Sequence, residues 1–106
     1  MKYLVSASQG LGFSTPEEAI EVLEDLVLPS FAMLERFETE KKILAGGLPV
    51  GERALVFIVE AASHEEVDSM LRGLPVWGAL EWEVTPLQTF AGRAAKDRAV
   101  LRELKG

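Results

Sequence analysis

Glu81 and Glu83 are the side chains of this sequence best placed to move a proton, because only one residue separates them. Residues 80–84 read Leu-Glu-Trp-Glu-Val, and this strict alternation predicts a strand whose two glutamates share one face. Two carboxylates that share a cleft suit acid–base catalysis. The alternative, which the pattern favours, is an edge strand whose charges keep the sheet from aggregating.

Arg53, the pair Gly46-Gly47 and Trp77 are candidates for binding a substrate. Arg53 precedes a strongly apolar run, where it meets either an anionic substrate or a neighbouring glutamate at the surface. The glycine pair would let a ligand approach the backbone, although a β-bulge is the commoner role of glycine within a strand. Trp77 would serve as a lid or a dimer anchor, or it would fill the core.

The sequence supplies few other reactive groups. His64 is the only histidine, and in the first turn of a predicted helix a solvated side chain is the usual outcome. There is no cysteine, which excludes disulfides, thiolate nucleophiles and cysteine metal sites. No metal-binding motif, dinucleotide fingerprint or nucleophile elbow is present. We therefore expect neither a metal nor a cofactor.

Charge and hydropathy narrow the class of protein. The 106 residues carry a net charge of −6, and the basic residues are scattered, which argues against nucleic acid as a partner. No apolar run approaches the roughly 20 residues of a membrane helix, so we expect no membrane partner. The first residues do not resemble a signal peptide. We expect a cytoplasmic protein.

The N-terminal half reads as a strand, a long helix and a second strand. Residues 3–7 are short and rich in β-forming side chains, and the Thr-Pro-Glu-Glu sequence at 15–18 is a capped helix start. Apolar residues then recur every three or four positions, which predicts a helix over residues 16–41. Pro29 predicts a kink or break at the residue before it. Residues 43–47 are a short second strand.

The C-terminal half repeats the pattern and adds a helix. Residues 54–59, Ala-Leu-Val-Phe-Ile-Val, predict a buried strand. The Ser-His-Glu-Glu sequence at 63–66 caps a second helix, which Gly73 ends. A fourth strand at 80–84, which Pro86 should end, precedes a terminal helix at 90–105.

This order of elements is that of the ferredoxin-like α+β fold, a βαββαβ antiparallel sheet with helices on one face. We treat residues 1–106 as one domain, with residues 88–106 as a C-terminal helical extension. The strand at 54–59 is apolar on both faces, but the helices cover only one. The same face of a second copy would cover the other in a homodimer or higher homo-oligomer. The alternative is that the terminal helix folds back over it.

Two short segments resemble a known family. Residues 71–75 read Leu-Arg-Gly-Leu-Pro, and residues 85–87 read Thr-Pro-Leu. They resemble the muconolactone Δ-isomerase family, in which a helix ending before Gly-Leu-Pro leads to a final strand ending in Thr-Pro-Leu. The resemblance implies a dimeric α/β barrel, with two ferredoxin-like sheets packed face to face. It also implies a cleft that binds small organic acids, lactones or aromatic compounds.

The family's catalytic set is not carried over. Its members have Trp, His and Arg near the second strand, whereas residues 42–48 hold none of these, and residues 88–90 replace a basic tail. We expect a small-molecule isomerase or lyase acting on a lactone or unsaturated organic acid, with Glu81 or Glu83 as general base. The alternatives are a non-catalytic module that binds a small ligand or self-associates, and a docking domain for another protein.

Overall fold

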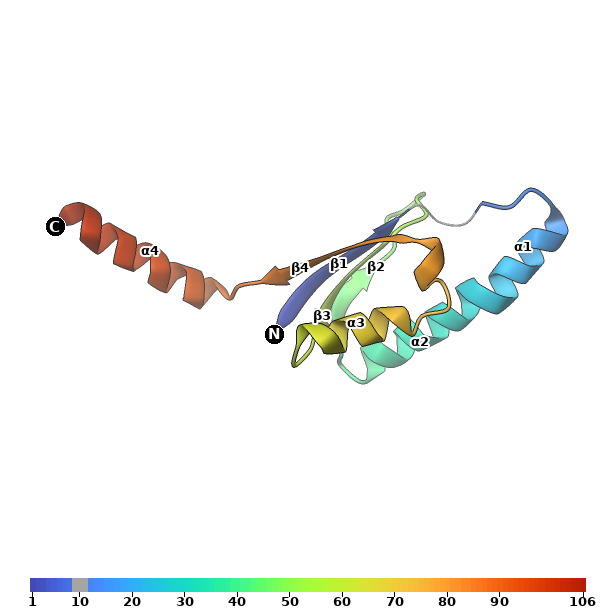
Figure 1. The fold of residues 1–106 in the computed structure, drawn as a ribbon, viewed down its shortest axis with the longest axis horizontal. Helices are drawn as coiled ribbons and strands as arrows, with labels where there is room; N and C mark the ends of the chain where they lie inside the picture. The colour runs from blue at the N-terminus through green and yellow to red at the C-terminus, as the bar shows by residue number, and fades with distance from the viewer. Residues whose placement is uncertain (9–11) are drawn as a thin grey trace.

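One antiparallel sheet of four strands organises the chain, with helices packed against a single face (Figure 1). The computed structural model describes residues 1–8 and 12–106. The glycine-containing stretch at 9–14, for which the sequence predicts a loop, lies partly outside the described residues. The strand order β2-β3-β1-β4 confirms the predicted ferredoxin-like fold. The elements are β1 (Lys2–Ser8), α1 (Pro16–Val22), the π-helix η1 (Leu23–Val27), α2 (Leu28–Thr39), β2 (Ile43–Gly47), β3 (Leu55–Glu60), α3 (His64–Arg72), the 3₁₀ turn η2 (Trp77–Ala79), β4 (Glu81–Leu87) and α4 (Phe90–Lys105).

The hydrophobic core lies between the sheet and the helices. Val5 of β1 pairs with Phe57 of β3 on one side and with Val84 of β4 on the other. Residues opposite each other in an antiparallel ladder point to the same face. Val5 and Phe57 are buried in one cluster with Phe37 of α2 and Val67 of α3. Alternate residues of the central strands therefore form the dry side of the sheet.

The other face of the sheet stays open. Leu4 pairs with Ile58, and Ser6 pairs with Val56, so these residues point away from the core. Leu4 and Val56 are each 38% exposed, and Ile58 is half-buried. We call this surface the open sheet face. Apolar side chains on both sides of β3 are thus present as predicted, with one side covered by the helices of the same chain.

The long helical region is continuous but not uniform. Its first turn is capped by Thr15, whose hydroxyl accepts a hydrogen bond from the Glu18 N–H at 3.1 Å. In η1 the backbone bonds reach one residue further, as in the bond from the Leu28 N–H to the Leu23 carbonyl. Pro29 lacks an N–H and crowds the carbonyl four residues before it. The predicted break before Pro29 is wrong, because Leu28 keeps a helical backbone. The helix instead contains a widened π turn over Leu23–Val27, with α-helix on either side.

β2 contains a bulge, but the bulge lies before the glycine pair and not at the glycines, where the sequence predicts it. The register with β3 shifts between Ile43 and Ala45. Gly46 has a φ of 148°, and a Cβ at this position would collide with Phe57 and with the carbonyl oxygen of Val56. Only glycine combines this backbone angle with so close an approach to β3.

The prediction that Pro86 ends the fourth strand is wrong, because β4 continues to Leu87. Pro86 lies opposite Tyr3 in the register with β1. β4 is an edge strand with a neighbour on one side only. A proline is tolerated there because an edge strand leaves half of its N–H groups outside the ladder.

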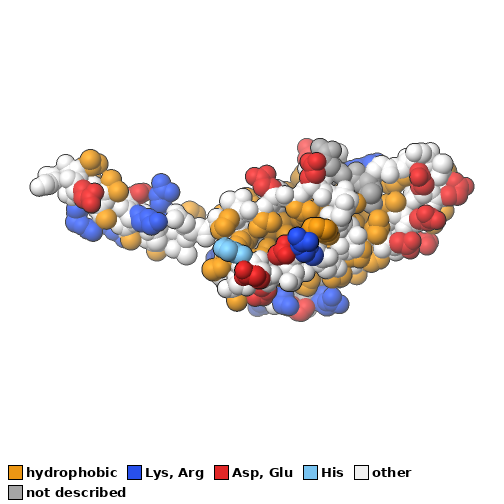
Figure 2. Space-filling model, viewed as in Figure 1, with side chains coloured by type: hydrophobic (Ala, Val, Ile, Leu, Met, Phe, Trp, Pro, Cys, Tyr) orange, Lys and Arg blue, Asp and Glu red, His pale blue; other side chains and the backbone are white. Residues whose placement is uncertain are grey.

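The terminal helix α4 occupies the predicted residues but leaves the body of the molecule. Thr89 caps it by accepting a hydrogen bond from the Gly92 N–H at 3.0 Å. None of its residues is buried, and the helix projects beyond the end of β4 along the 69 Å long axis (Figures 1 and 2). It therefore does not fold back over the open sheet face.

Candidate functional site

An apolar cavity of about 240 Å³ lies between the long helix and the end of the sheet where β3 begins. The helical period turns one face of η1 and α2 toward the sheet, so Val27, Phe31 and Leu34 form one wall. Leu55 and Leu80 contribute to the opposite side. Such a cavity suits a small, largely apolar molecule.

Ser30 is a polar side chain in the cavity wall, and its hydrogen bonds are already committed. It is buried, with its hydroxyl donating to the Leu26 carbonyl at 2.7 Å and accepting from the Val76 N–H at 3.1 Å. The hydroxyl therefore ties α2 to the segment after α3. A nucleophilic serine needs a free hydroxyl beside a base. Ser30 therefore has a structural role and is not a candidate nucleophile.

Two charged residues stand side by side at the cavity, Glu52 and Arg53. A tight turn places them there: Gly51 has a φ of 81°, and the Glu52 N–H donates to the Pro49 carbonyl at 3.2 Å. The Arg53 guanidinium lies 5.2 Å from the centre of the Phe13 ring, within the range of a cation–π contact. Both side chains are exposed, so a carboxylate and a guanidinium border an otherwise apolar space.

Glu81 and Glu83 lie on the opposite side of the sheet from this cavity. Glu83 pairs with Ser6 and Glu81 with Ser8, which puts both carboxylates on the open sheet face, exposed. Trp82 points to the helices, and its indole N–H donates to the Trp77 carbonyl at 2.9 Å. The two glutamates therefore share one face, as the alternation predicts, but the sheet separates them from Arg53. Their position on an edge strand fits the charge-protection alternative.

The glycine pair and Trp77, which the sequence offers as further binding residues, have structural positions away from the cavity. Gly46 serves the close approach of β2 to β3, and Gly47 follows it in the same exposed strand segment. Trp77 is half-buried against the core, with the Arg72 guanidinium 4.5 Å from its ring centre. Neither the glycine pair nor Trp77 lines the cavity. Arg53 is the predicted site residue that does.

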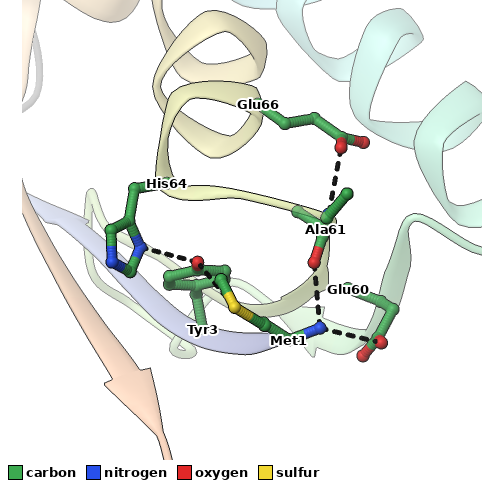
Figure 3. A network of polar contacts seen from close by, with 7 residues as sticks. Met1, Tyr3, Glu60, Ala61, His64 and Glu66 are labelled. Carbon is green, nitrogen blue, oxygen red and sulfur yellow. Dashed lines mark hydrogen bonds and ion pairs between the residues drawn. The ribbon is translucent and has the colours of Figure 1, made fainter.

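A second depression, of about 300 Å³, lies between α3 and the β1–β4 side of the sheet. Tyr3 and His64 are among its lining residues and share a hydrogen bond of 2.7 Å between Oη and Nδ1 (Figure 3). The two rings also meet edge to face at 5.5 Å between centres. His64 is exposed but not simply solvated, which corrects the expectation from the sequence.

Burial raises the pKa of the Tyr3 hydroxyl above its ordinary value of 10.0, and the carboxylates of Glu65 and Glu66 raise it further. Tyr3 therefore stays protonated at neutral pH. The Tyr3–His64 pair comes from residues 61 positions apart, and no local pattern links them. The sequence patterns also did not identify Glu52 as a site residue. Its position next to the candidate Arg53 was the feature of the sequence that could have indicated it.

Residues 1–8 and 12–106 contain no group of three or more His, Asp or Glu side chains able to hold a metal ion. No helix among them has the length and the apolar character needed to span a bilayer.

A ferredoxin-like sheet with a small apolar cavity under its helices defines an α+β protein suited to a small-molecule ligand. The chain belongs to the muconolactone delta-isomerase family, whose family model matches residues 1–92. The resemblance seen in residues 71–87 is thereby confirmed. Membership in this family suggests enzymatic action on a small molecule.

Two solved structures share the fold. A muconolactone isomerase is similar with a TM-score of 0.69 and 20% sequence identity, over 84% of this chain and 90% of that chain. The second is a 5-chloro-2-hydroxyhydroquinone dehydrochlorinase from Burkholderia phenoliruptrix AC1100, in complex with 2,5-dihydroxybenzoquinone. Its TM-score is 0.63 at 20% identity, over 87% of this chain and 98% of that chain. No curated protein sequence matches the chain.

Proposed function

We propose that this protein is a small-molecule isomerase or lyase that acts on a lactone or an unsaturated organic acid bound in the cavity beside Arg53. The observation that carries the proposal is an apolar cavity with one carboxylate and one guanidinium at its border. The family membership supports the reaction class, and the two structural neighbours are an isomerase of muconolactone and a dehydrochlorinase of 5-chloro-2-hydroxyhydroquinone.

Each part of the cavity has a role in this mechanism. The walls around Phe31 and Leu34 hold the ring of the substrate and exclude water. The planar guanidinium of Arg53 binds a substrate carboxylate through two parallel hydrogen bonds. The Glu52 carboxylate takes a proton from the saturated carbon beside the substrate's double bond, while the conjugated carbonyl takes up the negative charge. It returns the proton to the far carbon of the original double bond, so the double bond moves by one carbon. Atoms balance, because the same proton leaves and re-enters.

Glu81 and Glu83 form the alternative base pair for this reaction. They would reach a substrate bound on the open sheet face, where both carboxylates are exposed. Glu52 is the better candidate because it borders the apolar cavity together with a cation. Mutagenesis can distinguish the two candidate bases, because Glu52 and the Glu81–Glu83 pair lie on opposite sides of the sheet.

The test measures turnover of muconolactone and of 5-chloro-2-hydroxyhydroquinone by the purified protein and its variants. Glu52→Gln should lower kcat by about 100-fold or more, the usual contribution of a general base. Arg53→Gln should raise KM about tenfold or more, because a charge-assisted hydrogen bond is worth about 1.5–3 kcal/mol. Glu38→Gln, on an exposed position of α2, is the matched control and should leave both constants unchanged.

The double variant Glu81→Gln with Glu83→Gln decides between the two base assignments. Full turnover in this variant with loss in Glu52→Gln supports the cavity mechanism. Loss in the double variant with full turnover in Glu52→Gln would move the chemistry to the open sheet face. Binding of the substrates in calorimetry without any turnover would favour the non-catalytic ligand-binding module, which the apolar walls of the cavity also suit.

We also propose that the open sheet face pairs with the same face of a second copy. Leu4, Val56 and Ile58 form an apolar centre there, and the helices of the chain lie on the other side. Sheet-on-sheet packing would bury this surface. Val56→Lys should halve the mass in light scattering, whereas Val50→Lys, at a fully exposed turn, should not. A wild-type protein that sediments as a monomer would contradict this pairing.

A further inference from the structure

Helices α1 and α4 both leave apolar side chains in water. Neither helix contains a buried residue. Ile20 and Leu23, at the junction of α1 and η1, are 55% and 43% exposed, while Leu101 and Leu104 of α4 are 49% and 79% exposed. A contiguous apolar strip on a helix that packs against little else is typical of an interaction surface.

The two helices carry the same spacing of apolar and charged residues, with opposite charge. In each helix, an apolar residue at position i is followed by a leucine at i+3. Charged residues lie at i−3 and i+4. This spacing puts all four side chains on one face of a helix. The acidic stripe is Glu17, Ile20, Leu23 and Glu24, and the basic stripe is Arg98, Leu101, Leu104 and Lys105.

The charges of both stripes are available for a partner. In the described part of the chain, none of the four charged residues takes part in an ion pair, whereas Arg93 of α4 pairs with Asp97 at 3.4 Å. Residues 90–105 contain five basic and two acidic side chains, and residues 1–89 contain six basic and fifteen acidic ones. A basic terminal helix thus belongs to an acidic body.

The two stripes cannot meet within one molecule. The helix α1 lies at one end of the 69 Å long axis and α4 projects from the other (Figure 1). Figure 2 shows acidic side chains gathered over the α1 end and basic side chains along α4. Complementary surfaces at opposite ends of one chain fit a contact between copies.

We propose that the basic stripe of α4 docks on the acidic stripe of a second copy of this chain. Leu101 and Leu104 pack against Ile20 and Leu23 of the neighbour, while flanking charges pair across the helix contact as in a coiled coil. The contact is heterologous, so copies join head to tail or exchange their terminal helices. The family match ends at residue 92, near the start of α4, and the proposal does not depend on the proposed reaction.

Charge reversal tests this docking by analytical ultracentrifugation of the full chain. The variant Arg98→Glu with Lys105→Glu should weaken association by about tenfold or more, because two attractive pairs become repulsive. The variant Glu17→Lys with Glu24→Lys should weaken it similarly. Combining all four changes should restore association, since the charges are complementary again.

A matched control separates this contact from a general effect of charge. Lys96→Glu lies on the opposite side of α4 from the basic stripe and changes the net charge as much as Arg98→Glu alone does. It should leave the association unchanged, whereas Arg98→Glu should weaken it. Any pairing of the open sheet faces is untouched by these variants, so a sheet-paired dimer or a monomer should remain. Circular dichroism checks that each variant is folded.

The absence of cysteine from the chain allows a second, direct test. Ile20→Cys in one preparation and Leu101→Cys in another, one of them carrying a size tag, should give a mixed disulfide on oxidation. Val50→Cys in place of Ile20→Cys should not. Unchanged association in both reversal variants together with no mixed disulfide would overturn the proposal.

Discussion

Replacing Ser30 by alanine removes a hydroxyl that joins the long helix to the segment after α3. The Ser30 side chain is 2% exposed and accepts a hydrogen bond from the Val76 N–H at 3.1 Å. Without that acceptor, the Val76 N–H is left in the protein interior unpaired, at a cost of about 1–3 kcal/mol. Alanine is the better helix former by at most about 0.7 kcal/mol, so the free energy of unfolding should still fall.

Ser69→Ala is the matched control, because Ser69 is an exposed serine within α3. It shares the change in helix propensity but removes no buried partner. Thermal and urea unfolding of both variants should therefore differ by about 1–3 kcal/mol. In a domain of this size each kcal/mol lowers Tm by about 4–8 °C. Equal stabilities for the two variants would refute the role given to the Ser30–Val76 bond.

Two more predictions concern β2 and the Tyr3 hydroxyl. Gly46→Ala should lower the free energy of unfolding by about 1–3 kcal/mol because its Cβ collides with β3, whereas Gly47→Ala meets nothing within 4 Å and should be nearly neutral in the same urea titration. The pKa of Tyr3 is raised on folding, so the unfolded chain loses that proton first, and stability should be full below pH 10.0 and fall as the pH rises further. Tyr3→Phe should abolish this alkaline fall in unfolding experiments between about pH 9 and pH 11, and a fall of the same size in the variant would assign it to other groups.

Local sequence patterns were sufficient for the elements. The caps at Thr15 and Ser63 are present as hydrogen bonds, and the strand at 54–59 is found at Leu55–Glu60. Each of these signals acts within a few residues, so the order βαββαβ follows from them. The extension of β4 past Pro86 did not follow, because tolerance of a proline depends on which strands are neighbours.

The candidate site was only partly accessible to such reasoning. Strand alternation correctly put Glu81 and Glu83 opposite Trp82, since the pleat is a local property. Which face then receives a cavity depends on where the helices lie. The cavity is formed by segments from Phe13 to Leu80, and its polar border at Glu52 and Arg53 becomes visible only when those segments pack together.

The sequence by itself determined the kinds of element, their order, the family and the two-sided apolar character of β3, because period, capping and motif spacing are properties of neighbouring residues. The tertiary structure alone decided that Arg53 borders the cavity while Glu81 and Glu83 face away from it. It alone paired Tyr3 with His64 and carried α4 away from the sheet. These features depend on contacts between distant segments and on the helix packing of the whole chain, which no local pattern encodes.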